Sequence, residues 1–471
     1  MNSQCIISYK MQNKKWLVLL ALLAAVLLPV IFTGYAEIKK GQAEFSAQNY
    51  ANAEDSFKRA AFYLPWRTDL WEQAGIAASE NGNPTDAISF LKRAPKLSER
   101  GWLALASSYY NTGDIPFALK AYQQGSQVYD SASLYAGLAY IYRQQKNWSA
   151  ESDALKHQTK LDEGNVYAHY RLGLLLTILE PENALPELMS ASSLDPETDS
   201  AVQTLRAALN ISAAQTDPSQ QMVTRGRALG LVQEWDLSIA AFEKAITLNA
   251  ENAEAWAWLG EAKQQTGADG SVELNRAVTL DGKSVIVRAL RGLYFDRQKK
   301  YPQMLAEYLS AAEFEPANPA WQASVGDAYS KNGDLVAALK AYQRATELAP
   351  NEPTYFRLLA VFCADNSVHV EDLGLPAAQK AVELAPDDPL ALDALGWSYF
   401  SSGRYANAEQ ILSDVVLRFP DYLSARLHLA MTYIAQGNRA SAFSELTYVR
   451  DSDANGADGL FAAQLLKKYF P

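Results

Sequence analysis

Residues 322–350 read QASVGDAYSKNGDLVAALKAYQRATELAP, and this stretch contains the pattern on which the fold depends. Small residues stand at Gly326, Ala338 and Ala345, and Pro350 closes the stretch. Between them, apolar residues recur at spacings of three and four, as they do on the buried face of an amphipathic helix. The stretch therefore predicts two helices of about 14 residues each, joined by a short turn.

The same pattern returns along most of the chain. The first small residue of each unit, here called the lead residue, occurs at Gly41, Gly75, Ala106, Ala139, Gly173, Gly226, Gly260, Gly292, Gly326, Ala360, Gly396 and Ala430. Successive lead residues are 31 to 36 positions apart, except for one interval of 53. Such a period is typical of stacked helix pairs, because one pair cannot bury its apolar face alone. The long interval contains residues 198–218, which we expect to be an irregular helical interruption, either an unpaired helix or a degraded repeat.

Small residues and proline have separate expected tasks within a unit. The lead residue lets the second helix approach closely, and the Ala twelve positions later, such as Ala338, is its expected partner across that contact. A glycine supplies the left-handed conformation that closes the first helix; the expected positions are Gly82, Gly113, Gly333, Gly403 and Gly437. Proline ends the second helix; the expected positions are Pro65, Pro196, Pro316, Pro350, Pro386 and Pro420.

These units resemble the tetratricopeptide repeat (TPR) family. The family motif, Trp-x2-Leu-Gly-x2-Tyr followed by Ala, an aromatic residue and Pro, is met closely at Trp256–Gly260 and again from Trp102 to Tyr122. The resemblance covers residues 34–452. It implies an all-α fold, a right-handed superhelical α-solenoid of about 12 helix-turn-helix units, and the chain looks bacterial.

The resemblance divides the chain into parts. Residues 34–197 and 219–452 are the expected N-terminal and C-terminal parts of the repeat array, on either side of the interruption. Residues 453–471 are expected to form a helix that caps the last exposed face. The register departs from the family pattern in the second helix after Gly260 and in the link Asp365–Pro376.

An apolar run precedes the repeats. Residues 16–33, WLVLLALLAAVLLPVIFT, contain no charge, and these eighteen residues approach the roughly 20 that a membrane-spanning helix needs. Lys10, Lys14 and Lys15 precede the run, and positive charge on this side favours a cytoplasmic segment at residues 1–15. We therefore predict a single-pass membrane protein whose repeat array lies outside the cytoplasm.

Two other interpretations of the N-terminus stay open. A cleaved signal peptide would end at the small residues of Gly34–Ala36, although the apolar run exceeds the usual core of about 7–15 residues. The charge difference between the two flanks is small, so a repeat array inside the cytoplasm is the second alternative. Cys5 precedes the apolar run and is therefore not a lipoprotein attachment site, and Met11 is an alternative start.

Charge and composition exclude several classes of function. The 471 residues carry a net charge of −11, whereas a nucleic-acid partner requires a basic face. Two cysteines cannot build a disulfide framework or a cysteine-based zinc site, and Cys363 is expected to be a buried, unreactive thiol. Asp281–Ser284 resembles the end of a phosphate-binding loop, but position 277 holds Ala instead of the required Gly.

No motif points to catalysis, and no stretch outside the repeats is long enough for a catalytic domain. We therefore expect a protein that is not an enzyme, with no cofactor, metal or small-molecule substrate. A role as an enzyme or as the accessory of one is the rival hypothesis, and turnover by the purified protein would revive it.

The TPR resemblance implies that extended peptides or partner helices bind along the concave groove formed by the first helices. Helical geometry places the groove positions six and three before, and one and four after, each lead residue. Tyrosine and arginine, which often carry interface energy, occupy several of these positions; the candidates are Arg100, Tyr110, Tyr140, Arg143, Tyr167 and Tyr170. Apolar candidates near the C-terminus are Trp397, Phe400, Leu427, Met431 and Ile434.

Each group has a simpler interpretation. The first is an ordinary solvated groove, and the second is a surface buried under the terminal helix. No lead residue is followed by the Asn that chaperone-binding TPR domains use for a terminal carboxylate. The favoured function is a membrane-anchored scaffold for an unknown protein partner. The alternative is an exported, soluble accessory subunit of an envelope enzyme or assembly machine.

Overall fold

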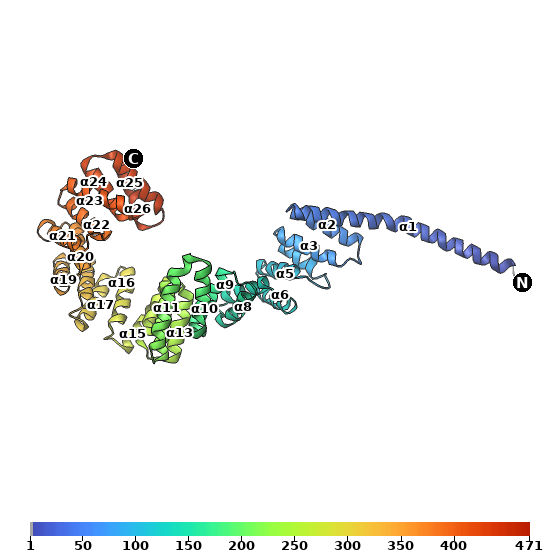
Figure 1. Ribbon diagram of the computed structural model, residues 1–471, viewed down its shortest axis with the longest axis horizontal. Coiled ribbons are helices and arrows are strands. Elements are labelled where there is room, and N and C mark those ends of the chain that lie inside the picture. Colours follow the sequence, from blue (N-terminus) through green and yellow to red (C-terminus); the bar gives the residue numbers. More distant parts are fainter. Residues whose placement is uncertain (1–2) are drawn as a thin grey trace. The chain divides into compact units, whose positions relative to one another are not determined.

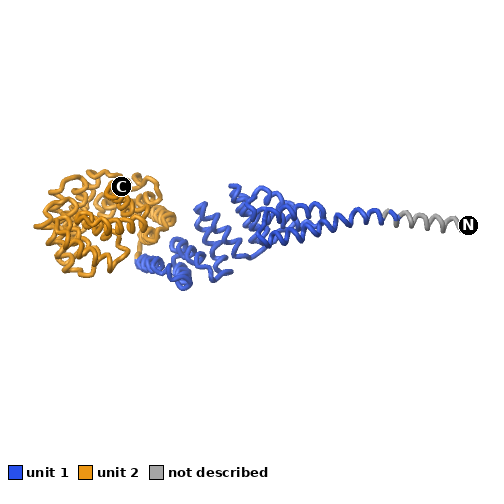
Figure 2. Tube along the Cα trace, turned by 90° about the horizontal axis from the view of Figure 1, so that it is seen from above, with its two compact units in different colours: residues 1–214 blue, residues 215–471 orange. Residues whose placement is uncertain are grey.

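The computed structural model describes the backbone of residues 3–471 and the side chains of Trp16, Val18 and residues 20–471. Over these residues the chain is helical, with no strand. It divides into two compact units, residues 1–214 and 215–471 (Figure 2). Helix pairs follow one another within each unit (Figure 1), which confirms the predicted all-α solenoid of helix pairs after an N-terminal apolar helix.

Unit 1 contains five helix pairs and one further helix. They are α1 (Ser3–Ser46), α2 (Tyr50–Tyr63), α3 (Asp69–Glu80), α4 (Pro84–Leu91), α5 (Glu99–Asn111), α6 (Ile115–Val128), α7 (Ala132–Gln144), α8 (Trp148–Leu161), α9 (Val166–Leu179), α10 (Pro181–Leu194), the 3-10 turn η1 (Pro196–Thr198) and α11 (Asp199–Ala214).

Unit 2 contains seven helix pairs and a terminal helix. They are α12 (Pro218–Leu231), α13 (Trp235–Leu248), α14 (Ala253–Gln265), α15 (Ser271–Leu280), α16 (Val285–Arg297), α17 (Tyr301–Phe314), α18 (Pro319–Lys331), α19 (Leu335–Leu348), α20 (Pro353–Asn366), the π-helical turn η2 (Val370–Gly374), α21 (Leu375–Leu384), α22 (Pro389–Ser401), α23 (Tyr405–Arg418), α24 (Leu423–Gln436), α25 (Arg439–Ser452) and α26 (Ala457–Tyr469).

The lead residue is small because a large side chain of the second helix lies on its backbone. A Cβ added at Gly75 would stand 2.4 Å from Leu91 Cγ, and one added at Gly396 would stand 2.5 Å from Leu412 Cγ. These partners follow their lead residues by sixteen positions. The expected partner, the Ala twelve positions on, is fully buried but does not supply the closest atoms, so that part of the prediction is wrong.

The turn after each first helix has a nearly constant geometry. The residue seven positions after the lead residue has a positive φ in every repeat except the one led by Gly173. Glycine provides it at the five predicted positions and also at Gly267. Where glycine is absent, the same position is left-handed in a larger residue; these residues are Gln48, Lys146, Gln233, Lys299 and Ser367. The fold therefore imposes this conformation even where the residue type opposes it.

The second helices end as predicted, but three of them are shorter than expected. The residue before each of the six predicted prolines is the C-cap of its helix, as in α2, where Leu64 precedes Pro65. The lengths of α4, α15 and α21 are 8, 10 and 10 residues. The π-helical turn η2 occupies part of the link Asp365–Pro376 and packs Gly374 against Cys363.

Residues 199–214 form one continuous helix, α11, rather than a helix pair. Of the two interpretations of the long interval, the unpaired helix agrees with this geometry. At the other end of the chain, α26 packs on α24 and α25 through Ala462, Leu465 and Leu466. Leu427 is buried in the same cluster, with Met431 and Ile434 packed against it, so the simpler interpretation of these three apolar candidates is correct.

Helix α1 joins the apolar run directly to the first repeat. It continues from Ser3 to Ser46 without a break, and Leu20–Ser46 is the one described helix long and apolar enough to cross a membrane. The apolar side chains from Leu20 to Leu28 are exposed, and packing against α2 begins with Ile31 and Gly34. The candidate residues Cys5, Lys10, Met11, Lys14 and Lys15 lie outside the part whose side chains are described.

The left-handed turn position predicts opposite effects for two substitutions. Gln233→Gly relieves a strained conformation, whereas Gly333→Ala introduces one, and each should change the free energy of unfolding by roughly 0.5–1 kcal/mol. We expect the urea midpoint to rise for the first variant and to fall for the second. Gln233→Ala, which keeps the strain, is the matched control and should differ little from the parent; a rise equal to that of Gln233→Gly would contradict the explanation.

Candidate functional site

The first helices form the inner layer of each stack. In unit 1, α3 contacts α5 and α5 contacts α7; in unit 2, α12 contacts α14, α14 contacts α16, and α20 contacts α22, which contacts α24. Within the described residues, second helices of neighbouring repeats make no contact of similar extent. The layer whose members lie closer together is the concave one, so the predicted groove positions lie on first helices of the inner layer.

Two predicted tyrosines meet between neighbouring repeats of unit 1. Tyr110 on α5 and Tyr140 on α7 place their hydroxyl oxygens 2.9 Å apart, and their ring centroids are 5.3 Å apart in an edge-to-face arrangement. The hydrogen bond between them is the main reason that the pKa of Tyr110 lies above its ordinary value. Tyr140 remains 48% exposed, so each ring holds the other in place while leaving contact surface open.

The next pair of helices repeats this arrangement with arginine. Arg143, one turn after Tyr140 on α7, donates a hydrogen bond from Nη1 to the Tyr167 hydroxyl on α9 at 2.6 Å. Tyr167 is 57% exposed, and Tyr170 follows it on α9 half-buried. Five of the six predicted residues therefore lie along three consecutive first helices; this Tyr/Arg strip comprises Tyr110, Tyr140, Arg143, Tyr167 and Tyr170.

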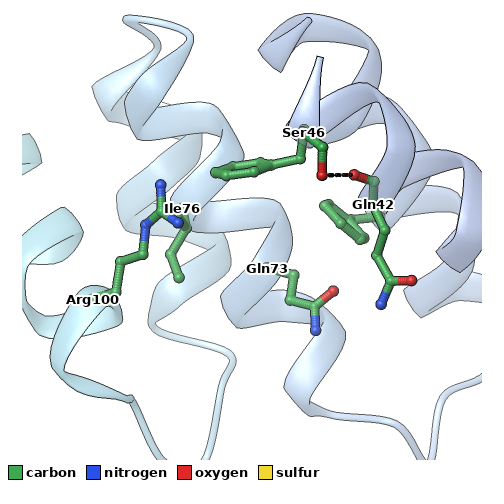
Figure 3. Close-up of a pocket in the computed structure, with 7 residues that line it drawn as sticks. Gln42, Ser46, Gln73, Ile76 and Arg100 are labelled. Carbon is green, nitrogen blue, oxygen red and sulfur yellow. Dashed lines mark hydrogen bonds between the residues drawn. The ribbon is translucent and has the colours of Figure 1, made fainter. Parts of the chain in front are cut away.

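The sixth residue, Arg100, lines a cavity of about 270 Å³ between α1, α3 and α5 (Figure 3). The cavity is lined by Gln42, Phe45, Ser46, Phe57, Gln73, Ile76 and Arg100. Arg100 donates to Glu80 at 2.9 Å, and its guanidinium carbon lies 4.7 Å from the centroid of the Phe45 ring. Gln73 Oε1 is buried with no hydrogen-bond partner. The cavity thus combines apolar side chains with the Arg100 guanidinium.

Sequence reasoning missed most of this cavity. Gln42, Phe45 and Ile76 occupy the one-after and four-after positions of the first two repeats, so the same offsets would have found them. Gln73 stands two positions before its lead residue, which is not one of the offsets used. The cavity forms where α1 and α3 leave space above Phe57 of α2, and no spacing along the chain indicates such a gap.

The aromatic candidates near the C-terminus pack against neighbouring repeats of the same chain. Trp397 stacks on Phe400 at 4.7 Å and on His428 at 4.2 Å between ring centroids. Its Nε1 donates to Asp365 at 2.7 Å, and His428 Nδ1 lies 2.7 Å from Asp393. These contacts link α20, α22 and α24, so Trp397 and Phe400 connect repeats and leave less free surface than the Tyr/Arg strip.

Charged side chains connect the middle repeats of unit 2. Arg297 on α16 donates to both carboxylate oxygens of Glu261 on α14, at 2.7 and 2.6 Å. Lys331 on α18 does the same to Asp296 on α16, at 3.0 and 2.9 Å. The hydrogen bonds that Arg297 donates to Glu261 are the main cause of the raised pKa of this arginine. This face is therefore a set of paired charges, unlike the Tyr/Arg strip.

The other sequence features have structural tasks. In Asp281–Ser284, Asp281 accepts hydrogen bonds from two backbone N–H groups of the turn, and Ser284 caps α16 by accepting from Val287 N. Among the described residues, no cluster of three or more His, Cys, Asp or Glu side chains has a geometry for a metal ion. Cys363 is fully buried in α20.

Comparisons with known proteins agree on the repeat type. Family models described as "Tetratricopeptide repeat" match residues 38–100, 290–353, 325–389 and 399–458. Superkiller protein 3 of Schizosaccharomyces pombe is 24% identical over 302 residues, which cover 59% of this chain and 18% of that protein. Tetratricopeptide repeat protein 37 of Xenopus laevis is 23% identical over 321 residues, which cover 65% and 19%. The chain thus spans about a fifth of the length of these relatives.

Solved structures resemble the chain more distantly. Yeast Tom70 is 15% identical, with a TM-score of 0.43, over 92% of this chain and 95% of that one. A tetratricopeptide repeat protein from Parabacteroides merdae is 12% identical, with a TM-score of 0.45, over 53% of this chain and 97% of that one.

The burial of Cys363 predicts an unreactive thiol. Burial raises the pKa of this thiol to about 12, so almost none of it is thiolate near neutral pH. In a Cys5→Ser variant, a thiol reagent at pH 8 should modify the folded chain at least roughly 100-fold more slowly than it modifies the chain in urea. Rapid stoichiometric modification of the folded variant would contradict this burial.

The same shift predicts a pH effect with a defined sign. The pKa in the folded chain lies above the unfolded value of about 8.5, so folding favours the protonated thiol. The corresponding stability is present below about pH 8.5 and is lost as the pH rises toward 12. Cys363→Ala should lack this contribution, so the difference in urea midpoint between parent and variant should narrow as the pH rises over that range.

Proposed function

Since the chain belongs to the tetratricopeptide repeat proteins, we propose that it is a membrane-anchored, non-enzymatic scaffold that binds an extended segment of a protein partner along the inner face of unit 1. TPR proteins mediate protein–protein interactions, and the fold is typical of scaffolds. The observation that carries the proposal is the Tyr/Arg strip, in which three consecutive first helices present linked aromatic and guanidinium groups with exposed surface.

The strip is suited to peptide binding because its side chains are already held in place. Tyr140 and Tyr167 are each fixed by a hydrogen bond from the neighbouring repeat, so a partner would order few side chains on binding. Tyrosine offers a large apolar ring together with a polar hydroxyl, and tyrosine and arginine are enriched among residues that dominate interface energies. Their hydroxyl and N–H groups match the hydrogen-bonding groups of a peptide backbone.

The cavity beside Arg100 extends the proposed site. Helix α5 contributes both Arg100 to the cavity and Tyr110 to the strip, so the two features lie on consecutive first helices. A cavity of this kind accepts one apolar side chain. We expect the bound segment to carry such a side chain at its end nearest α1.

The packing of α1 supports an uncleaved anchor over a removed signal peptide. Gly34 lies against Leu64, and a Cβ added at Gly34 would stand 2.5 Å from Leu64 Cγ. Ile31 packs on the same core. Cleavage after Ala36 would remove both residues and expose Leu64, which is completely buried in the whole chain. Retention of the segment preserves this part of the first repeat.

Truncation of the strip should reduce peptide affinity. Peptides selected on the purified chain from a random display library should bind Tyr140→Ala and Tyr167→Ala at least roughly tenfold more weakly, which corresponds to about 1.4 kcal/mol per variant. Phe117→Ala is the matched control, since Phe117 is an exposed aromatic on the second helix α6. Equal losses in all three variants, measured by fluorescence anisotropy, would argue against the strip as the site.

Topology and processing are tested together. A reporter that works only outside the cytoplasm, fused after Pro471, should be active, and N-terminal sequencing of the isolated protein should find residues before Trp16 intact. An active reporter with Glu37 as the first residue would replace the anchor with the exported, soluble alternative. An inactive reporter on a membrane-bound protein would place the repeats in the cytoplasm.

A further inference from the structure

Two exposed aromatic side chains lie at the end of the first repeat that is nearest the apolar part of α1. Phe62 is 79% exposed and Trp66 is 58% exposed. They flank Leu64, whose side chain contacts Gly34, directly after the apolar run. Helix α2 runs back along α1, so the turn between α2 and α3 returns to the level where the apolar run ends (Figure 1).

Further aromatic side chains of α1 gather at the same level. Phe32 and Tyr35 are largely exposed. The hydrogen bond with Asp69 raises the pKa of Arg67, which follows Trp66 in the turn, and Tyr35 lies close enough to raise it further. The aromatic residues of α1 and of the turn therefore lie near one another. Aromatic residues exposed at one level on a soluble domain indicate a contact surface, and this composition is typical of the boundary between lipid and water.

The corresponding turn of the second repeat is basic. Helix α4 ends at Leu91, and the turn that follows exposes Lys92, Arg93 and Lys96. None of the three forms an ion pair with a described carboxylate; instead, Lys92 lies over the Tyr109 ring and Arg93 over the Trp71 ring. In a chain with a net charge of −11, this exposed group of unpaired cations is suited to anionic lipid headgroups.

The corresponding turns of the third and fourth repeats are acidic instead of basic. The corresponding turns after α6 and α8 contain Asp130, Asp162 and Glu163, which anionic lipid would repel. The turns are thus aromatic in the first repeat, basic in the second and acidic in the next two. This order is expected when each successive repeat lies further from a membrane surface.

We propose that the turn from Phe62 to Trp66 lies in the lipid headgroup region of the membrane that α1 crosses, with Lys92, Arg93 and Lys96 facing anionic headgroups. This proposal rests on the proposed membrane anchor. Because α1 has no break between the apolar run and Gly34, the first repeat cannot move away from the membrane surface on a flexible linker. The contact would fix the orientation of the first two repeats relative to the bilayer.

Fluorescence quenching by spin-labelled lipids tests the contact. The full chain, with Cys5→Ser and one added cysteine carrying a fluorophore, is reconstituted in phosphatidylcholine vesicles with and without phosphatidylglycerol. Thr68→Cys places the label beside the turn while leaving Phe62 and Trp66 intact. Asn111→Cys, at the opposite end of the repeats, is the matched control. Headgroup-level quenchers should quench the label at position 68 but not at position 111, and more strongly in anionic vesicles.

Two further variants separate the possible failures. A label at Leu23→Cys, quenched by spin labels on the acyl chains, reports the anchor itself. Quenching at position 23 but not at position 68 would overturn the contact and leave the anchor standing, whereas no quenching at position 23 would overturn both. Phe62→Ser together with Trp66→Ser should weaken quenching at position 68 without abolishing it, because α1 still holds the first repeat beside the bilayer; undiminished quenching in this variant would also overturn the proposal.

Discussion

The contact between each lead glycine and a large side chain of the second helix, fourteen to sixteen positions later, is the constraint on which the rest of the structure depends. At Gly41 the partner is Phe57, at Gly226 it is Phe242, and in each case a Cβ on the lead residue would stand under 3.0 Å from the partner ring. Since the second helix can approach closely only where the first presents glycine or alanine, the contact sets the spacing within a pair. The stacked pairs then determine which side chains of successive first helices meet.

Much of the fold follows from spacing alone, whereas side-chain partnerships do not. The period of the repeats, the prolines that end the second helices and the glycines of the turns can be recognised in the sequence. Each depends on a backbone geometry that particular residue types favour. The partner of the lead residue was predicted wrongly, because a helical period identifies the buried face but not which of its residues reaches furthest. The short helix α4 and the turn η2 depend on local packing that no repeat pattern encodes.

The candidate site shows the same division. Arg100, Tyr110, Tyr140, Arg143, Tyr167 and Tyr170 were found by offset, and the structure places them all on first helices. That Tyr110 meets Tyr140, thirty positions away, depends on the rotation between two repeats. Trp397 illustrates the opposite case, since it has a groove offset but its ring stacks on His428 of the next repeat. The offset from the lead residue therefore identifies residues of the inner helix layer. Whether such a residue has surface open to a partner depends on how its side chain packs.

The middle repeats of unit 2 and the Tyr/Arg strip of unit 1 differ in the side chains on their inner faces. In unit 2, Glu261, Asp296, Arg297 and Lys331 pair between first helices, and binding there would require breaking ion pairs or desolvating them together. In unit 1, the Tyr/Arg strip links helices through hydroxyl groups and leaves ring surface exposed. A partner can gain apolar contact on such a face without separating charges.

The unbroken helix α1 has a mechanical consequence. A transmembrane helix adjusts its tilt when its apolar length and the hydrocarbon thickness differ, and a flexible linker would isolate the attached domain from that adjustment. Here the packing of Gly34 on Leu64 makes the first repeat and α1 move together as one rigid body. With α1 in a bilayer, a change in membrane thickness would therefore swing the first repeat and its share of the inner face, so the direction in which a partner is presented would depend on the lipid composition.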